Sequence, residues 1–184
     1  MAEKKRDELG ELLDKQAITE VIYRYCRGID RMDRELTLSC WHPDGTADYG
    51  VLFAGLGSGF VEWIWPVHAE MEHTQHTIKN ILIEVEGDKA ASESYFIVYL
   101  RVKNDEGTFD IIGTGRYVDH FERRSDLWKI SHRQVVYDWN RTEKVTSHFP
   151  VSTAIPPNNP AGTTLRGMRN REDYSYRALK RVYG

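Results

Sequence analysis

Residues 77–139, TIKNILIEVEGDKAASESYFIVYLRVKNDEGTFDIIGTGRYVDHFERRSDLWKISHRQVVYDW, decide the fold of this chain. Alternating, β-branched and aromatic runs are separated there by three polar turn sequences, EGDK, NDEG and RRSD. This pattern predicts four antiparallel strands joined by tight turns. Gly113 and Gly115 stand two residues apart in the third strand, where missing side chains permit a bend or the close approach of a ligand.

The residues before this meander favour helices. From about Glu8 to Arg31, apolar side chains recur three or four residues apart, which predicts a long helix packed on one face. Asp33 can cap a short second helix that runs to Cys40 and Trp41. The turn sequence HPDGT then leads into a brief strand over residues 47–49.

The next segment predicts a flexible glycine-rich loop over residues 55–59 and then a third helix. FVEWIWPVHAEM, residues 60–71, has helical character, and Pro66 either kinks this helix or lies in its first turn. Helices first and a meander afterwards predict an α+β domain. We expect the helices to fill the concave side of a strongly curved sheet.

Composition excludes several classes of function. The chain has 25 Lys and Arg against 28 Asp and Glu, a net charge of −3, so no basic footprint for nucleic acid or acidic lipid is present. No apolar run is long enough to span a membrane, which predicts a soluble, cytoplasmic protein that binds a small molecule. Cys26 and Cys40 have no partners at zinc spacing, so we expect two buried thiols.

The periodicity ends at about Arg141, which divides the chain into a domain of residues 1–140 and an extension of residues 141–184. This tail contains four of the six prolines and should be extended up to a short helix near residues 173–182. Its apolar residues exceed those of a disordered linker. We therefore expect it to pack on its own domain or on a neighbouring subunit.

Asp30 and His76 are the residues best placed for acid–base chemistry. Asp30 lies at the edge of the apolar arc of the first helix, one turn beyond Cys26, so its carboxylate should point partly inward. His76 stands where the third helix gives way to the sheet, and an aspartate beside it would stabilise the imidazolium that forms on proton transfer. The alternatives are an Asp30 that turns to solvent or pairs with Arg27 or Arg34, and a His76 packed in the core.

Tyr25, Arg133 and Arg116 are candidates for binding a substrate oxygen. Tyr25 lies near Asp30 on the first helix, and a buried phenol usually finds a hydrogen-bond partner. Arg133 faces opposite to Asp138 on its strand, and one of the two faces is concave. An inward Arg133 would bind substrate or stabilise developing charge, because a buried arginine needs a carboxylate or an oxyanion. Arg116 poses the same alternatives on the adjacent strand.

Aromatic side chains gather in the segments that would border a cavity. Most should lie in the core, and some should line a substrate pocket. Those predicted for the pocket are Tyr49, Phe53, Trp63, Trp65 and Tyr99. His73 and His76 are three residues apart, but no third ligand follows at a recognisable spacing, so no metal site is predicted.

Four stretches together resemble a known family: LLDKQAITEVIYRYCRGIDRMD, WHPDGTADYG, HTIKN and GTGRYVDHFERRSDLWKISHRQVVYDW. Residues 8–140 are similar to the SnoaL-like branch of the nuclear transport factor 2-like superfamily. The resemblance implies a cone-shaped barrel with a mixed, mostly antiparallel sheet. It also implies that an aspartate, a histidine and an arginine act together, at Asp30, His76 and Arg133. Tyr25 resembles the tyrosine of members that eliminate water.

The resemblance implies a cofactor-independent lyase that eliminates water from a hydroxylated aromatic or polycyclic molecule. The same proton relay could instead break a carbon–carbon bond, as in retro-aldol loss of formaldehyde from a lignin-derived diaryl compound, or isomerise a ketosteroid-like substrate. A non-catalytic binding module or dioxygenase β-type subunit is the alternative from another class. Association through the open sheet face would give a homo-oligomer, either a dimer or a trimer.

Overall fold

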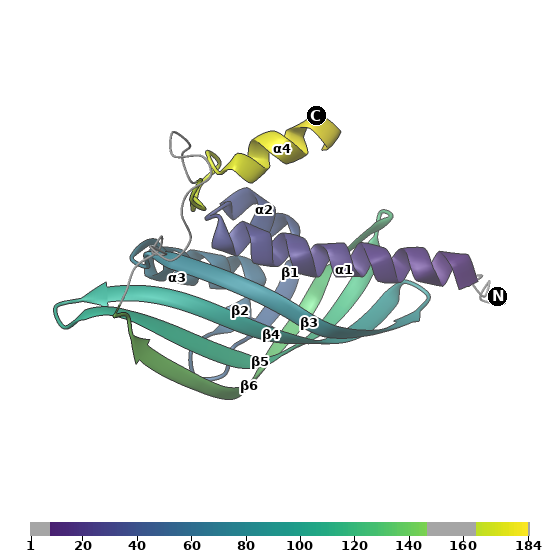
Figure 1. Cartoon of the computed structure of the whole chain (residues 1–184). Helices are drawn as coiled ribbons and strands as arrows, with labels where there is room; N and C mark the ends of the chain where they lie inside the picture. The colour runs from purple at the N-terminus through teal and green to yellow at the C-terminus, as the bar shows by residue number, and fades with distance from the viewer. Residues whose placement is uncertain (1–7, 147–164, 184) are drawn as a thin grey trace.

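Six strands form one curved sheet that carries helices on one face (Figure 1). The computed structural model describes residues 8–146 and 165–183. The helices are α1 (Glu8–Asp30), α2 (Arg34–Ser39), α3 (Gly57–Ala69) and α4 (Tyr174–Tyr183). The strands are β1 (Trp41–Asp48), β2 (Ala54–Leu56), β3 (His73–Glu86), β4 (Lys89–Asn104), β5 (Gly107–Arg124) and β6 (Leu127–Lys144).

The strands follow the order β2-β1-β6-β5-β4-β3. β3, β4, β5 and β6 form an antiparallel meander, which confirms the four predicted strands. β1 pairs in parallel with β6, and β2 pairs antiparallel with β1, so the sheet is mixed and mostly antiparallel. The predicted α+β fold is confirmed, although the sheet stays open at its β2 and β3 edges and does not close into a barrel.

The long first helix is held by one apolar face. Ile18, Val21, Ile22, Tyr25 and Ile29 are buried along α1, at the spacing that the sequence predicts. Each such side chain contributes about 1.5–3 kcal/mol when it leaves water. Burial of this face against the sheet therefore fixes the last turn of α1. Among the described residues, no helix is both long and apolar enough to cross a lipid bilayer.

Gly115 lies at an irregularity of the sheet, in the strand where the sequence permits a bend or the close approach of a ligand. A Cβ at this position would meet the carbonyl oxygen of Val136 at 2.2 Å and the Phe96 ring at 2.9 Å. The pairing of β5 with β6 shifts at this point, because Gly115 opposes Tyr137 whereas Thr114 opposes Trp139. The missing side chain thus lets two strands and an aromatic ring approach closely at an irregularity in the ladder.

The segment between α2 and α3 differs from the prediction. The brief strand expected at residues 47–49 is instead the longer β1, because β6 supplies a distant hydrogen-bonding partner and a register shift absorbs the turn sequence. The predicted glycine loop is also wrong: residues 54–56 form β2, and α3 begins at Gly57 against the Trp41 ring. Pro66 lies inside α3, so a place in its first turn is excluded.

The sheet continues beyond residue 140, where the strand pattern was expected to end. Lys144 at the end of β6 still pairs with Phe109 of β5. Most of the extended stretch predicted for the tail lies outside the described residues. The helix predicted near residues 173–182 is present as α4.

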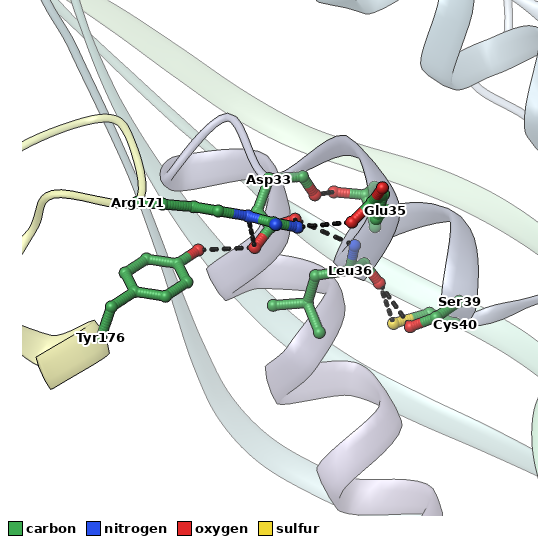
Figure 2. A network of polar contacts seen from close by, with 8 residues as sticks. Asp33, Glu35, Leu36, Ser39, Cys40, Arg171 and Tyr176 are labelled. Atoms are coloured by element: carbon green, nitrogen blue, oxygen red, sulfur yellow. Dashed lines mark hydrogen bonds and ion pairs between the residues drawn. The ribbon is translucent and has the colours of Figure 1, made fainter. Parts of the chain in front are cut away.

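The described part of the tail contacts α1 and α2 of its own chain (Figure 1). Figure 2 shows Asp33 at the centre of this contact. Its carboxylate accepts hydrogen bonds from the Leu36 backbone at 3.2 Å, from Arg171 at 2.9 Å and from the Tyr176 hydroxyl at 2.8 Å. Burial alone would raise the pKa of Asp33, but these donors hold it below its ordinary value. Asp33 thus caps α2, as predicted, and also anchors the tail.

Asp33→Ala should lower the free energy of unfolding by about 1–3 kcal/mol, because it removes the carboxylate that caps α2 and also accepts hydrogen bonds from Arg171 and Tyr176. Arg171→Gln is the matched control: the Arg171 side chain is 62% exposed, so its loss should cost much less than the loss of Asp33. Urea unfolding followed by tryptophan fluorescence measures both values. Equal losses in the two variants would contradict the anchoring role of Asp33.

Candidate active site

A cavity of about 380 Å³ lies between the helices and the concave face of the sheet. Its size falls within the range of small-molecule sites, roughly 300–1,000 Å³. α1, α3 and strands β3 to β6 contribute its walls, which are mostly apolar. The aromatic residues that line it are Tyr25, Tyr49, Phe60, Trp63, Phe96, Tyr117, Tyr137 and Trp139. The cavity can therefore hold a small aromatic molecule out of water.

Asp30 and His76 meet at the wall of this cavity. One carboxylate oxygen of Asp30 lies 2.7 Å from Nδ1 of His76, and the other accepts the backbone N–H of His76 at 2.8 Å. Asp30 is the last residue of α1, whereas His76 belongs to β3 and lines the cavity. The solvent-facing Asp30 considered above is thereby excluded. The two side chains form a buried carboxylate–imidazole dyad.

The geometry of the dyad determines which ring nitrogen is available. A carboxylate only accepts hydrogen bonds, so in the neutral imidazole of His76 the proton is on Nδ1 and the lone pair is on Nε2. The second bond, to the backbone of His76, fixes the carboxylate relative to the ring. Nε2 can therefore take a proton from a bound molecule, while the carboxylate stabilises the imidazolium that results.

Tyr25 and Tyr49 form a second polar pair in the same cavity. Their hydroxyl oxygens are 2.7 Å apart. Burial is the main cause that raises the pKa of each phenol, so both remain protonated at neutral pH. One hydroxyl proton is used between the two rings, and the other is free to bind an acceptor. The pair is thus a hydrogen-bond donor for an oxygen atom of a ligand.

Arg133 lies behind this phenol pair and does not line the cavity. Its side chain is 0% exposed and donates two hydrogen bonds to Asp119, at 2.8 and 2.7 Å. The guanidinium carbon stands 4.2 Å from the centre of the Tyr25 ring and 3.9 Å from that of Tyr117. The inward orientation agrees with one predicted alternative. Arg133 is therefore not a cavity-lining residue, and Asp119 supplies the carboxylate that a buried arginine needs.

Tyr49 and Trp63 line the cavity, as predicted. Phe53 does not line it and instead packs against the Trp63 ring, with 5.8 Å between the centroids. Trp65 also misses the cavity and packs against the core, because it lies two residues from Trp63 and thus on another side of α3. Phe53 and Trp65, which were predicted to line the pocket, are therefore not cavity-lining residues.

Tyr99 and Arg116 lie on the opposite face of the sheet. Val98 and Tyr117 line the cavity, and neighbouring residues of a strand point to opposite faces. Arg116 is paired with Glu93 at 2.9 Å on that outer face. Tyr99 and Arg116 are therefore not pocket residues, and the outward alternative holds for Arg116.

His68 lines the cavity and was missed by the sequence analysis. It is 5% exposed, and its ring centre lies 6.5 Å from that of His76. Burial, with help from His76 and Arg169, lowers the pKa of His68 to about 4. The helical spacing could have indicated that His68 is buried, since it follows Ile64 by four residues on the buried face of α3.

The described residues contain no group of three His, Cys, Asp or Glu side chains that could hold a metal ion. His73, the possible metal partner of His76, does not line the cavity. Cys26 and Cys40 are free and buried, as predicted. Burial raises the pKa of both thiols, that of Cys40 to about 11, so neither is a reactive thiolate.

Residues 10–134 match the model of the SnoaL-like domain family. The chain belongs to this family. No curated protein matches the sequence significantly. The match to the family model confirms the predicted resemblance. It covers α1 from residue 10 onward and the residues of the cavity wall up to residue 134 of β6.

Solved structures share the fold of this SnoaL-like protein at low identity. Hexachlorocyclohexane dehydrochlorinase LinA-type3 from Novosphingobium barchaimii is 20% identical, with coverage of 82% of this chain and 100% of the other and a TM-score of 0.67. A protein designated a scytalone dehydratase, from Novosphingobium aromaticivorans, is 20% identical, with coverage of 79% and 97% and a TM-score of 0.65. Kfla4162 from Kribbella flavida is 16% identical, with coverage of 71% and 95% and a TM-score of 0.66. These neighbours include lyases.

Arg133→Leu should lower the free energy of unfolding by about 3–5 kcal/mol, because it leaves the carboxylate of Asp119 buried without a partner. The double variant that also carries Asp119→Leu should recover a large part of this loss. Arg116→Leu, on the exposed face, should cost much less than Arg133→Leu. Denaturant unfolding measures all three, and wild-type stability of Arg133→Leu would contradict the assignment of Arg133 as a supporting residue.

Proposed function

We propose that this SnoaL-like protein is a cofactor-independent lyase that eliminates water from a hydroxylated aromatic or polycyclic molecule. The observation that carries the proposal is the hydrogen-bonded dyad of Asp30 and His76 at the wall of an aromatic cavity. A non-catalytic binding module predicts a filled cavity and two side chains that do not meet. Two observations favour the enzyme over that alternative: a cavity of about 380 Å³ is present, and Asp30 and His76 are hydrogen-bonded.

His76 is the acid and the base in this reaction. Its Nε2 takes the proton from the carbon next to an electron-withdrawing carbonyl group, and the electron pair of that C–H bond forms the new double bond. The bond to the hydroxyl group breaks, and the departing oxygen takes back the proton from protonated His76 to leave as water. Asp30 orients the ring throughout and stabilises its charged form.

Tyr25 and Tyr49 bind the carbonyl oxygen of the substrate. Negative charge builds on that oxygen as the proton leaves the neighbouring carbon, and a phenol that donates a hydrogen bond stabilises it. Arg133 supports this from behind, since its positive charge lies against the Tyr25 ring and offsets part of the rise that burial causes in the pKa of Tyr49. The apolar walls strengthen these contacts because they exclude water.

The activity can be found without knowledge of the substrate. The purified protein, with no cofactor added, is screened against hydroxylated aromatic ketones, hydroxysteroids and diaryl propanoids while absorbance is followed for a new conjugated double bond. Water loss is expected to appear in this screen by mass spectrometry as a product 18 Da lighter. Release of formaldehyde instead would assign the carbon–carbon cleavage that the same relay permits.

His76→Ala and Asp30→Asn should each lower kcat by about 10² or more, in line with the contribution of a general acid–base group. His73→Gln is the matched control, since it alters a histidine of the same strand that lies outside the cavity, and it should keep wild-type kcat. Circular dichroism checks that all three variants fold. Wild-type turnover in His76→Ala or Asp30→Asn would refute the assignment.

A further inference from the structure

We propose that His68 is a second catalytic imidazole, which contacts the substrate as a neutral hydrogen-bond donor to an oxygen atom beside His76. The inference deepens the proposed function and rests on it. It concerns a residue of α3, an element that contributes nothing to the dyad of Asp30 and His76.

Position is the first support for this role. The His68 ring lines the cavity while the residue as a whole is nine-tenths buried. The ring planes of His68 and His76 are inclined by 30°, and their centres are 6.5 Å apart. A substrate atom that reaches Nε2 of His76 therefore lies within a few ångströms of a second imidazole.

The two ring nitrogens of His68 differ in their surroundings. Nδ1 is sealed from solvent and has no hydrogen-bond partner among the residues that the structure describes. A proton on Nδ1 would leave a buried donor unpaired, at a cost of roughly 1–3 kcal/mol. The proton therefore belongs on Nε2, which is the nitrogen that remains to meet a ligand. His68 presents an N–H group to the cavity, where His76 presents a lone pair.

Burial is the main cause that keeps the His68 ring neutral, and it lowers the pKa of His68 to about 4. His76 of β3 and Arg169 of the tail also disfavour a proton on the ring, whereas Asp30 of α1 favours one. Asp30 bonds to His76, so the positive charge that forms during turnover stays on His76. A neutral neighbour does not oppose that charge, whereas a second imidazolium would.

The tail fixes the backbone of His68. The guanidinium of Arg169 donates a hydrogen bond to the carbonyl oxygen of His68 at 2.7 Å and another to the carbonyl oxygen of Met71. His68 lies in the last turn of α3, where its carbonyl oxygen also accepts the backbone N–H of Met71 at 3.2 Å, and Met71 follows the helix end. Arg169 is thus a positioning residue, and it lies beyond residues 10–134 that match the family.

No proton leaves His68 in this scheme. Its N–H bond stays intact and polarises an oxygen of the substrate, and the proton that completes the departing water comes from His76. The substrate class follows from this arrangement. It carries a hydrogen-bond-accepting oxygen close to the carbon that loses the proton, in addition to the oxygen that faces Tyr25 and Tyr49.

Two variants of His68 distinguish a role as a hydrogen-bond donor from a role in packing alone. His68→Leu removes the donor, whereas His68→Gln retains an N–H group near the position of Nε2. The probes are 4-chromanone and 1-tetralone, which share the ketone that faces Tyr25 and Tyr49 and differ in a second acceptor oxygen that only 4-chromanone carries; their dissociation constants are measured by calorimetry. The preference for 4-chromanone should fall roughly three- to tenfold in His68→Leu and stay within about twofold of wild type in His68→Gln. An unchanged ratio in His68→Leu, or no measurable preference in wild type, would overturn the proposal.

A nuclear magnetic resonance titration of the wild-type protein tests the neutral state without any ligand. The imidazole signals of His68 should show no titration between about pH 5.5 and pH 8.5. A midpoint within that range would overturn the proposal, whatever the variants do. Both readouts are independent of turnover, so an inactive wild-type protein would count against the proposed function and leave the role of His68 to be decided by binding and titration.

Discussion

The contact between Asp30 and His76 is the interaction on which the rest of the structure depends. It joins the last residue of α1 to β3 through two hydrogen bonds from one carboxylate. The carboxylate of Asp30 is held in place because the apolar face of α1 is buried. Three residues later, Asp33 caps α2, where the chain changes direction. The helix layer and the sheet are therefore held in register at the point where a proton would be transferred.

Polar groups around the cavity are arranged in two layers. Groups that a ligand can touch, such as Tyr49 and His76, face an apolar space, and charged groups such as Arg133 and Asp119 lie behind them. This arrangement keeps the charges of Arg133 and Asp119 paired with each other, while the neutral Tyr49 hydroxyl and the His76 ring can meet the ligand. A dry cavity with fixed dipoles stabilises developing charge better than water does, since the dipoles need no reorganisation.

Sequence patterns predicted the parts of this site that depend on periodicity. The apolar face of α1 and the four-strand meander follow from spacings of three to four and of two residues. Strand register does not follow from them, so Asp119 opposite Arg133 was not foreseen and the arginine was assigned to the substrate. The same ambiguity placed Tyr99 on the wrong face. His68 was overlooked because a lone histidine on an apolar helix face is more often packed in a core than functional.

The central claim is that the carboxylate of Asp30 leaves Nε2 of His76 as a free proton acceptor within the cavity. A long-range proton–nitrogen correlation spectrum of the uniformly ¹⁵N-labelled protein at mildly alkaline pH reads the tautomer of each neutral histidine directly. The account predicts that the proton of neutral His76 is on Nδ1, and that Asp30→Ala abolishes this preference. A spectrum in which wild-type His76 carries its proton on Nε2 would contradict the account, because no base would then face the cavity.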